Sequence, residues 1–260
     1  MKYCKDLKIV AAEYPSDGYV LLRLTDNEPL GEILGGQFVE IRVDGTADTF
    51  LRRPISVNYV DRKNNELHLL IQIVGDGTKQ LSTLKAGDKL NVLFPLGNGF
   101  TQGKSGEKVL LVGGGVGIAP LLEYGKQLRE AGATPVFLLG GRSKRNLLML
   151  DRYSEIGEVY VTTEDGSLGE KGFVTQHSCL KTLCEAGSDI RISVCGPKPM
   201  MVAVARFAKA NNIRCEVSLE NMMACGLGAC LCCVEKTVKG NVCVCKEGPV
   251  FNINDLTWQI

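Results

Sequence analysis

Residues 108–120 read KVLLVGGGVGIAP, an apolar run that passes directly into glycines and then into the helical pattern PLLEYGKQLREAG. The apolar run is typical of a buried strand. A glycine turn between a strand and a helix leaves free backbone amides at the positive end of the helix dipole, where a phosphate can bind. The spacing is not the standard G-x-G-x-x-G dinucleotide pattern, because Ile118 occupies the last position. The candidate nucleotide-binding glycines are Gly113, Gly114, Gly115 and Gly117.

More strand-like runs follow, with helical stretches between and after them: TPVFLLGG at 134–141, EVYVTTEDG at 158–166 and DIRISVCG at 189–196. Alternating strands and helices predict an α/β domain with a parallel sheet whose ligand lies at the carboxyl ends of the strands. Those ends carry glycines and polar residues, which favours a nucleotide site over the alternative that the glycines only tighten turns.

Charged residues at the strand ends bear on the choice of cofactor. Glu164 and Asp165 would repel a 2′-phosphate on an adenosine ribose and can accept a hydrogen bond from a free hydroxyl. They favour NAD over NADP. Arg142, Lys144 and Arg145 favour the opposite choice and weaken that preference.

The first hundred residues have a different pattern, with short alternating runs bounded by Gly, Asp and Asn. The runs are DLKIVAAEY, YVLLRLT, QFVEIRV, PISVNYV, ELHLLIQIV and KLNVLFPLG. Such runs without long helical periods predict a small antiparallel β-barrel or sandwich. Within RRPISV at 52–57, proline stiffens the backbone between Arg53 and Ser56. This pair suits a flavin, with the hydroxyl at the isoalloxazine edge and the guanidinium at the pyrophosphate.

A second flavin signal is GDGT at 75–78, where Gly77 and Thr78 open a short predicted helix. Their amides can hold the same diphosphate. Arg-Pro and Gly-Thr also occur in ordinary turns, so each feature has weight only together with the others.

Composition excludes several classes of function. The chain has 260 residues and a net charge of +1, whereas a nucleic-acid surface needs a clustered basic excess. No stretch approaches the roughly 18 apolar residues of a membrane span, and the N-terminus lacks the apolar core of a signal peptide. We therefore expect a soluble, cytoplasmic protein that binds neither nucleic acid nor membrane. In that compartment thiols stay reduced, so eleven cysteines favour metal binding or catalysis over disulfides.

Four of those cysteines lie within nine positions of ENMMACGLGACLCCVEKT at 221–238. Cys225, Cys230 and Cys233 form C-x4-C-x2-C, the spacing by which plant-type ferredoxins hold a [2Fe-2S] cluster with a fourth thiolate from further along. The residues between Cys225 and Cys230 are mostly small, so the backbone can approach and point amides at the sulfurs. A tetrahedral zinc site is the alternative, but such a site more typically shows two separated C-x2-C pairs.

The spacing does not identify the fourth ligand. Cys232 neighbours Cys233 and lies outside the C-x4-C-x2-C frame, so we expect it to point away. Cys243 and Cys245 alternate with valines in NVCVC, which predicts that both lie on the same face of a strand. Both stay candidates.

The ordered segments of the chain carry a family resemblance. Along the chain stand RPIS, GDGT, FPLGNGF, GGGVGIAP, CGPKPM and CGLGACLCC. They resemble the ferredoxin reductase superfamily and, more closely, the electron-transfer subunits of class B (NAD-dependent) dihydroorotate dehydrogenases. The resemblance extends over essentially the whole chain, and MACGLGACLCC with the later CKEGPVF is its most specific part. It implies a FAD-binding antiparallel β-barrel at 1–101, an NAD-binding α/β domain at 102–214 and a small [2Fe-2S] domain at 215–260.

The resemblance also assigns residues. The thiol before the family's acidic-Gly-Pro-Val-Phe ending corresponds to Cys245, which makes it the fourth cluster ligand. Cys232 stands where the family has a small residue, often Gly, and this departure leaves ligand swapping or extra oxygen sensitivity open. Cys195 corresponds to a cysteine that positions the hydride path between nicotinamide and flavin; the alternative is a cysteine buried at a strand end. The implied flavin residues are Arg53, Pro54, Ile55, Ser56, Leu70, Ile71, Gln72, Gly77 and Thr78.

The resemblance finally implies a reaction. In the family, NAD exchanges a hydride with FAD, and the cluster moves single electrons. A separate FMN-containing catalytic subunit oxidises dihydroorotate to orotate in pyrimidine biosynthesis, and electrons run from that FMN through the cluster and FAD to NAD+. We therefore expect an electron-transfer subunit in a heterotetramer with two copies of each chain. The alternatives are a related subunit of a sulfide dehydrogenase or bifurcating transhydrogenase, and a non-enzymatic redox sensor.

Overall fold

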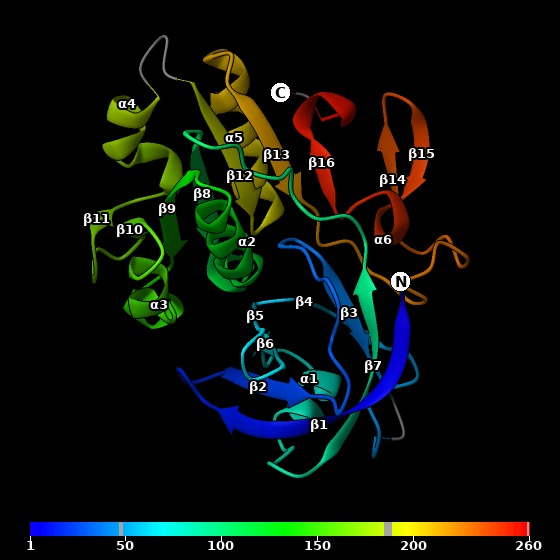
Figure 1. Ribbon diagram of the computed structural model, residues 1–260. Helices are drawn as coiled ribbons and strands as arrows, with labels where there is room; N and C mark the ends of the chain where they lie inside the picture. Colours follow the sequence, from blue (N-terminus) through cyan, green and yellow to red (C-terminus); the bar gives the residue numbers. More distant parts are fainter. Residues whose placement is uncertain (47–48, 185–188, 259) are drawn as a thin grey trace.

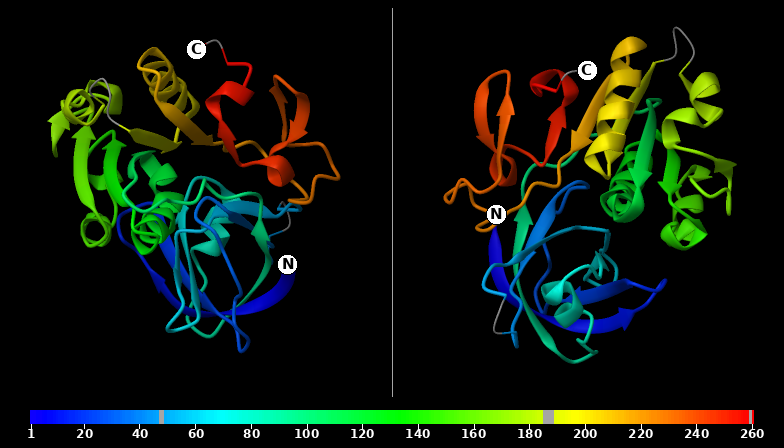
Figure 2. Two further views of the ribbon diagram at one scale, coloured as in Figure 1. Left: turned by 45° about the horizontal axis from the view of Figure 1, so that its top comes forward. Right: turned by 180° about the vertical axis from the view of Figure 1, so that it is seen from behind.

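The computed structural model describes residues 1–46, 49–184, 189–258 and 260. Two seven-stranded sheets and a two-stranded hairpin make up its β-structure. The sheet from the first hundred residues lies at the bottom of Figure 1, the sheet from the middle of the chain lies above it, and the C-terminal residues lie beside both (Figures 1 and 2).

The first sheet is antiparallel, with the strand order β4-β3-β7-β1-β2-β6-β5. Leu7 and Ile9 of β1 are buried on either side of the exposed Lys8, as expected for a strand with one face on the core. A short helix, α1, follows β6 as predicted. The elements are β1 (Tyr3–Glu13), β2 (Tyr19–Thr25), β3 (Phe38–Ile41), β4 (Arg53–Ser56), β5 (Tyr59–Asp61), β6 (Glu66–Gln72), α1 (Asp76–Leu81) and β7 (Lys89–Leu96).

The run PISVNYV does not form the single strand that its pattern predicts; it is divided between β4 and β5. Between them, the amide of Val57 donates to the carbonyl of Gln37 at 3.0 Å. At the buried Asn58 the backbone changes its pairing partner, because its amide donates to the carbonyl of His68 in β6 at 3.0 Å, while its side chain donates to the carbonyl of Ala119 at 3.0 Å. The run is therefore divided where it passes from pairing with β3 to pairing with β6.

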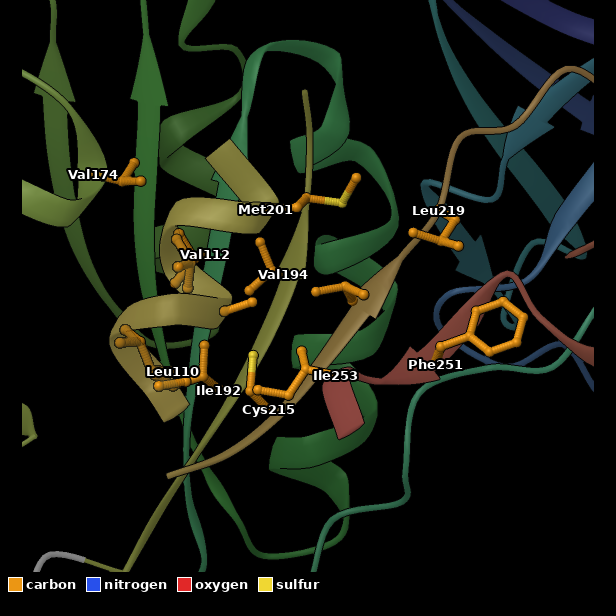
Figure 3. Packing of buried hydrophobic residues seen from close by; sticks show 14 of the residues in the cluster. Leu110, Val112, Val174, Ile192, Val194, Met201, Cys215, Leu219, Phe251 and Ile253 are labelled. Atoms are coloured by element: carbon orange, nitrogen blue, oxygen red, sulfur yellow. The ribbon is translucent and has the colours of Figure 1, made fainter. Parts of the chain in front are cut away.

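The second sheet has the order β11-β10-β9-β8-β12-β13-β16 and is parallel except for β16. Alternate residues of β8 face opposite ways: Val109 and Leu111 pack in the core of helix α2, whereas Leu110 and Val112 pack in the core that holds Met201 of helix α5 (Figure 3). Burial of both faces explains the continuous apolar run of this strand. The elements are β8 (Lys108–Gly114), α2 (Ala119–Glu130), β9 (Thr134–Gly141), α3 (Leu150–Ser154), β10 (Glu158–Thr163), β11 (Glu170–Lys171), α4 (Cys179–Leu183), β12 (Ile190–Cys195), α5 (Lys198–Ala210), β13 (Arg214–Ser218) and β16 (Val250–Asn252).

The C-terminal residues contact both sheets. Strands β14 (Val234–Thr237) and β15 (Gly240–Cys243) form a hairpin that leads into the one-turn helix α6 (Val244–Glu247). Strand β16 then pairs antiparallel with the edge strand β13. Asn98, just after the barrel, donates from its backbone to the carbonyl of Gly248 at 2.6 Å and from its side chain to the carbonyl of Glu247 at 2.9 Å. The segment is thus anchored at two places.

The predicted fold class is confirmed: an antiparallel barrel-like sheet, a parallel α/β sheet and a small C-terminal segment follow one another along the chain. The division into 1–101, 102–214 and 215–260 stays a prediction. Its second boundary falls inside β13, and β16 from the third segment belongs to the second sheet. Among the helices described, none has the length and apolar character needed to span a bilayer.

The buried Arg191 connects strands β12 and β13 with helix α2 and with the segment that precedes β8. Arg191 on β12 donates to both carboxylate oxygens of Glu107, at 3.0 and 3.2 Å, and to the hydroxyl of Tyr124 in α2 at 2.6 Å. It also reaches the carbonyl of Thr101 at 3.2 Å and the carboxylate of Glu216 in β13 at 3.3 Å. Hydrogen bonds from Arg191 hold the pKa of Glu107 below its usual value.

Replacing Arg191 with Met is expected to lower the free energy of unfolding by about 3–5 kcal/mol, because two carboxylates would lose their buried cation. Arg214→Met is the matched control, since that guanidinium is exposed and approaches Glu107 only to 3.6 Å; its loss should cost about 1 kcal/mol or less. Urea unfolding of both variants measures the difference. Equal losses would contradict the assignment of Arg191 as the buried connection.

Candidate cofactor sites

The carboxyl ends of the parallel strands form a cavity of about 640 Å³, called here the sheet-end cavity. It is lined by the glycine turn after β8, the ends of β9 and β10, and residues from the start of α5. This position is the one predicted from alternating strands and helices. Of the residues predicted to bind nucleotide, four line it: Gly114, Gly115, Gly117 and Glu164.

The glycines of the turn have different structural roles, in backbone conformation or in close packing. Gly115 has φ +57, a conformation that favours glycine, and a β-carbon there would meet no atom within 4 Å. A β-carbon on Gly117 would lie 2.5 Å from the Cα of Gly196, so this glycine permits two backbones to touch. Gly113 does not line the cavity, since a β-carbon there would lie 2.8 Å from the side chain of Ile118. Packing thus accounts for part of the glycine pattern.

Asp165 also lies outside the sheet-end cavity. Together with Lys144 and Arg145 it lines a separate hollow of about 510 Å³. Its carboxylate accepts hydrogen bonds from the hydroxyl of Ser167 at 2.6 Å and from the amide of Ser167 at 2.9 Å. These bonds lower the pKa of Asp165. Of the two predicted carboxylates, only Glu164 therefore borders the cavity.

A second cavity of about 590 Å³, called here the barrel cavity, opens between the barrel and the C-terminal segment. Most of the predicted flavin residues line it: Arg53, Pro54, Ile55, Ser56, Leu70, Ile71, Gln72 and Thr78. Gly77 is not in the lining, but a β-carbon there would lie 2.8 Å from Nε of Arg53. The hydroxyl of Thr78 accepts hydrogen bonds from the amides of Val74 and Gly75 at 2.9 and 3.0 Å, so it closes the turn.

The two cavities share a wall made of Gln72, Val116 and Glu220. Sequence reasoning missed Glu220, although its position directly after β13, at the carboxyl end of a parallel strand, is a signal for a site residue. Glu220 is exposed to the cavities that it lines, and desolvation by the surrounding protein raises its pKa. The fully buried Cys195 is not in the lining of either cavity; its Sγ lies 3.9 Å from Oε1 of Glu220.

The predicted cluster ligands lie as two pairs. The side chains of Cys225 and Cys230 contact each other, as do those of Cys233 and Cys245. Cys233 and Cys245 are buried, whereas Cys230 is exposed. In the part of the chain that the structure describes, no three His, Cys, Asp or Glu side chains are close enough to hold one metal ion together. Cys232 is exposed and lines the barrel cavity.

Backbone amides point at these sulfurs, as expected from the small residues of the loop. Gly228 donates to Sγ of Cys245 at 3.1 Å, and Leu227 donates to Sγ of Cys225 at 3.4 Å. Desolvation alone would raise the pKa of Cys225, but hydrogen bonds from nearby amides outweigh it and lower the pKa to about 6. Such amides stabilise thiolates and the anionic sulfurs of a bound cluster.

The expectation that Cys243 and Cys245 share one face of a strand is wrong. Strand β15 ends at Cys243, and Cys245 lies in the helical turn α6. Both sulfurs nevertheless lie near Gly228. Cys243 Sγ is 3.8 Å from its carbonyl oxygen, and its amide donates a hydrogen bond to Cys245 Sγ. Local alternation could not predict this turn, which Glu247 stabilises by accepting a hydrogen bond from the amide of Cys243 at 2.9 Å.

A buried carboxyl lies beneath residues 225–233, called here the cysteine loop. Glu40 on β3 is fully buried, and neither of its carboxyl oxygens has a hydrogen-bond partner among the described residues. A β-carbon on Gly226 would lie 2.8 Å from its Cγ, so the loop rests on this side chain. Burial raises the pKa of Glu40 to about 7, although Arg52 opposes the shift. No signal in the alternating pattern of FVEI distinguishes this residue from an outward-facing one.

Glu40→Gln should therefore stabilise the protein more at high pH than at low pH. Because the pKa of Glu40 is raised in the folded state, the native protein holds a proton that the unfolded chain releases, and stability falls as pH rises from the ordinary Glu value through about 7. Between about pH 6 and pH 8, the advantage of the Gln variant should grow by on the order of 1 kcal/mol.

Urea unfolding at the two pH values measures this growth. The control is Glu32→Gln, at an exposed carboxylate of the same domain, which should show no comparable change. A pH-independent advantage for Glu40→Gln would sink the account.

Comparisons with known proteins match two parts of the chain to described families. A family model described as the iron–sulfur cluster binding domain of dihydroorotate dehydrogenase B matches residues 220–257. A second, described as an oxidoreductase NAD-binding domain, matches residues 111–206. The first contains the paired thiols, and the second contains most of the sheet-end cavity.

Two relatives illustrate the similarity; both are named dihydroorotate dehydrogenase B (NAD(+)), electron transfer subunit. The protein from Fusobacterium nucleatum subsp. nucleatum is 39% identical over 227 residues, which cover 85% of this chain and 86% of the relative. The protein from Streptococcus pneumoniae strain R6 is 40% identical over 250 residues, which cover 94% and 95%.

Among solved structures, the NADH-dependent reduced ferredoxin-NADP oxidoreductase, described in work on flavin-based electron bifurcation, superposes with a TM-score of 0.85 at 31% identity, over 97% of this chain and 90% of that chain. A ferredoxin NADP+ reductase from Neisseria gonorrhoeae, solved with bound FAD and NADP, has a TM-score of 0.66 at 17% identity, over 80% of this chain and 91% of that chain. The second likeness concerns the fold alone.

Proposed function

The chain belongs to the family of dihydroorotate dehydrogenase B electron transfer subunits, and on that premise we propose that it carries electrons from a separate dihydroorotate-oxidising subunit to NAD+ in pyrimidine biosynthesis. The carriers on this chain are a [2Fe-2S] cluster and FAD. The partner is the FMN-containing catalytic subunit, in a complex with two copies of each chain.

One observation carries the proposal: the three candidate sites lie next to one another in space, with the barrel cavity between the cysteine loop and the sheet-end cavity. Cys232 of the cysteine loop lines the barrel cavity, and the barrel cavity shares Gln72, Val116 and Glu220 with the sheet-end cavity. A cluster, a flavin and a nicotinamide in these sites are neighbours in the order that electron transfer to NAD+ needs. When bound, FAD exchanges a hydride with NAD and single electrons with the cluster.

The paired thiols suit a [2Fe-2S] cluster, in which each iron takes two protein ligands. Cys225 and Cys230 would hold one iron, and Cys233 and Cys245 the other. The amides of Gly228 and Leu227, already directed at two of these sulfurs, offset the negative charge that four thiolates and two sulfides bring together. A structural zinc would need all four thiols around a single ion.

The barrel cavity suits FAD. Strand β4 presents Ser56 and Ile55 to the cavity, and the guanidinium of Arg53 lies against Gly77 at the start of α1. In this arrangement Arg53 and the amides of Gly77 and Thr78 bind the pyrophosphate, while Ser56 and Gln72 bind the isoalloxazine edge. Leu70 and Ile71 of β6 form an apolar wall that excludes water from the ring.

The sheet-end cavity suits NAD, with the pyrophosphate at the glycine turn and the ribose near Glu164. Cys195 acts as a positioning residue, because its thiol supports the Glu220 carboxyl at 3.9 Å from below the shared wall. The raised pKa of Glu220 keeps a proton on that carboxyl over a wider pH range, where it can donate a hydrogen bond at the meeting point of the two rings.

The placement of the two carboxylates gives a test of cofactor choice. Glu164→Gln removes a negative charge from a cavity that Arg142 also lines, and should raise the ratio of kcat/KM for NADPH over NADH by on the order of tenfold, which corresponds to about 1.4 kcal/mol. Asp165→Asn, whose side chain faces Ser167 instead, is the matched control and should leave the ratio near that of the wild type. Steady-state kinetics with an artificial acceptor give both ratios.

The function itself is tested on anaerobically purified, reconstituted protein. It should contain two irons, two sulfides and one FAD per chain, in keeping with one [2Fe-2S] cluster. NADH should reduce an artificial acceptor, yet dihydroorotate should be oxidised only after the catalytic subunit is added. Orotate formation by this chain alone, or zinc in place of iron, would refute the proposal.

A second candidate follows from the 31% identical structure of the ferredoxin-NADP oxidoreductase. A subunit of that type would serve electron exchange among NADH, ferredoxin and NADP. Co-purification with the catalytic dihydroorotate subunit, and transfer of electrons from dihydroorotate to NAD+ in the complex, would decide for the first function. Electron exchange between ferredoxin and NADP without any dihydroorotate-dependent activity would decide for the second.

A further inference from the structure

The C-terminal segment contains two thiols that the four-ligand assignment does not use, and one of them is Cys243. Cys243 is partly buried at the end of β15, two residues before Cys245, and its Sγ lies 3.8 Å from the carbonyl oxygen of Gly228. The amide of the same glycine donates to Cys245 at 3.1 Å. The sulfur of Cys243 thus lies near the carbonyl group of Gly228, and the sulfur of Cys245 lies near its amide.

The backbone of Cys243 also lies close to that of Cys233. Its strand pairs with β14 in a register that places Cys243 opposite Val234, the residue after Cys233. The amide that follows it, on Val244, donates to the carbonyl of Cys233 at 3.1 Å. The hairpin therefore holds Cys243 beside the backbone of Cys233, one of the two ligands proposed for the second iron.

We propose that Cys243 is a reserve ligand, which binds the second iron together with Cys233 when Cys245 is lost. This inference rests on the proposed [2Fe-2S] site. The exchange moves protons and no electrons: the thiol of Cys243 gives up its proton to solvent as the sulfur binds iron, and a displaced Cys245 thiolate takes up one proton. The total charge and oxidation state of the cluster stay the same.

Cys232, the other unassigned thiol, provides a contrast. It is next to Cys233 in sequence but lines the barrel cavity, on the side where the flavin would bind. Its neighbours in that lining include Met222 and Met223. Proximity in sequence therefore makes Cys232 look like the better substitute, whereas its place in the fold assigns it to the flavin side.

The test replaces cysteines with alanine, because serine can itself bind iron. Four variants are compared with the wild type after anaerobic reconstitution: Cys243→Ala, Cys245→Ala, Cys243→Ala with Cys245→Ala, and Cys232→Ala with Cys245→Ala. The readouts are iron and sulfide per chain and the EPR spectrum of the reduced protein. Bound FAD per chain reports whether each variant is folded.

Cys243→Ala should resemble the wild type. Cys245→Ala should keep a [2Fe-2S] cluster with altered EPR g values, and adding Cys232→Ala should not change that spectrum. Adding Cys243→Ala instead should lower the iron content on the order of tenfold or more, the size of effect expected when a metal site loses support. Loss of the cluster in Cys245→Ala itself, or loss with Cys232→Ala but not with Cys243→Ala, overturns the proposal.

The outcome for the wild type separates this inference from the proposed function. A wild type without iron would refute the [2Fe-2S] site and the reserve ligand together, whereas a normal wild type with a cluster-free Cys245→Ala refutes only the reserve ligand. If Cys245→Ala binds no FAD and is unfolded, the comparison moves to Cys245→Val, whose side chain fills more of the buried space and likewise cannot bind iron. There, adding Cys243→Ala should change the EPR spectrum, and an unchanged spectrum counts against the proposal.

Discussion

The contact between helix α2 and the barrel determines where the cofactor cavities lie. Asn58 gives its side chain to the carbonyl of Ala119 and its own carbonyl to the amide of Glu123. The carboxylate of Glu123, fully buried, accepts from the amide of Val60 at 2.8 Å and from Gln127 at 2.9 Å. Because α2 begins where the glycine turn ends, fixing its first turns on the barrel also fixes Val116 in the wall between the two cavities. Burying polar groups in this way is costly unless each finds a partner, so the contact specifies one orientation of the domains.

The third site is held in place by the sheets on either side of it. The chain leaves β13 through Leu219 and Glu220, passes along the barrel cavity, forms the cysteine loop and returns to β13 as β16. Glycine makes the passage possible at Gly226, where φ is +66 and the side chain of Glu40 lies directly beneath. The geometry of the thiols therefore depends on residues of all three segments of the chain.

Local signals predicted much of this arrangement. Alternating or continuous apolar runs gave the strands, the turn at 113–117 gave the sheet-end cavity, and the C-x4-C-x2-C spacing gave three of the paired thiols, because each of these properties is encoded within a few residues. The errors have two different causes. The division of β4 from β5 comes from the change of pairing strand at Asn58, which is a long-range effect, whereas the turn at Cys243 comes from a local hydrogen bond to Glu247 that strand alternation does not encode. Glu220 could have been found from its place at the carboxyl end of β13, but the burial of Glu40 beneath Gly226 involves a segment more than a hundred residues away, which no pattern within a few residues reports.

The pairing of β16 with β13 also affects how the edge of the parallel sheet is covered. A parallel sheet that ended at β13 would expose a row of unpaired amides and carbonyls, and such an edge invites pairing with a neighbouring chain. The last strand covers that edge with the chain's own C-terminal residues, Val250–Asn252. The segment that holds the thiols consequently also completes the parallel sheet, and its removal would uncover the backbone groups along β13.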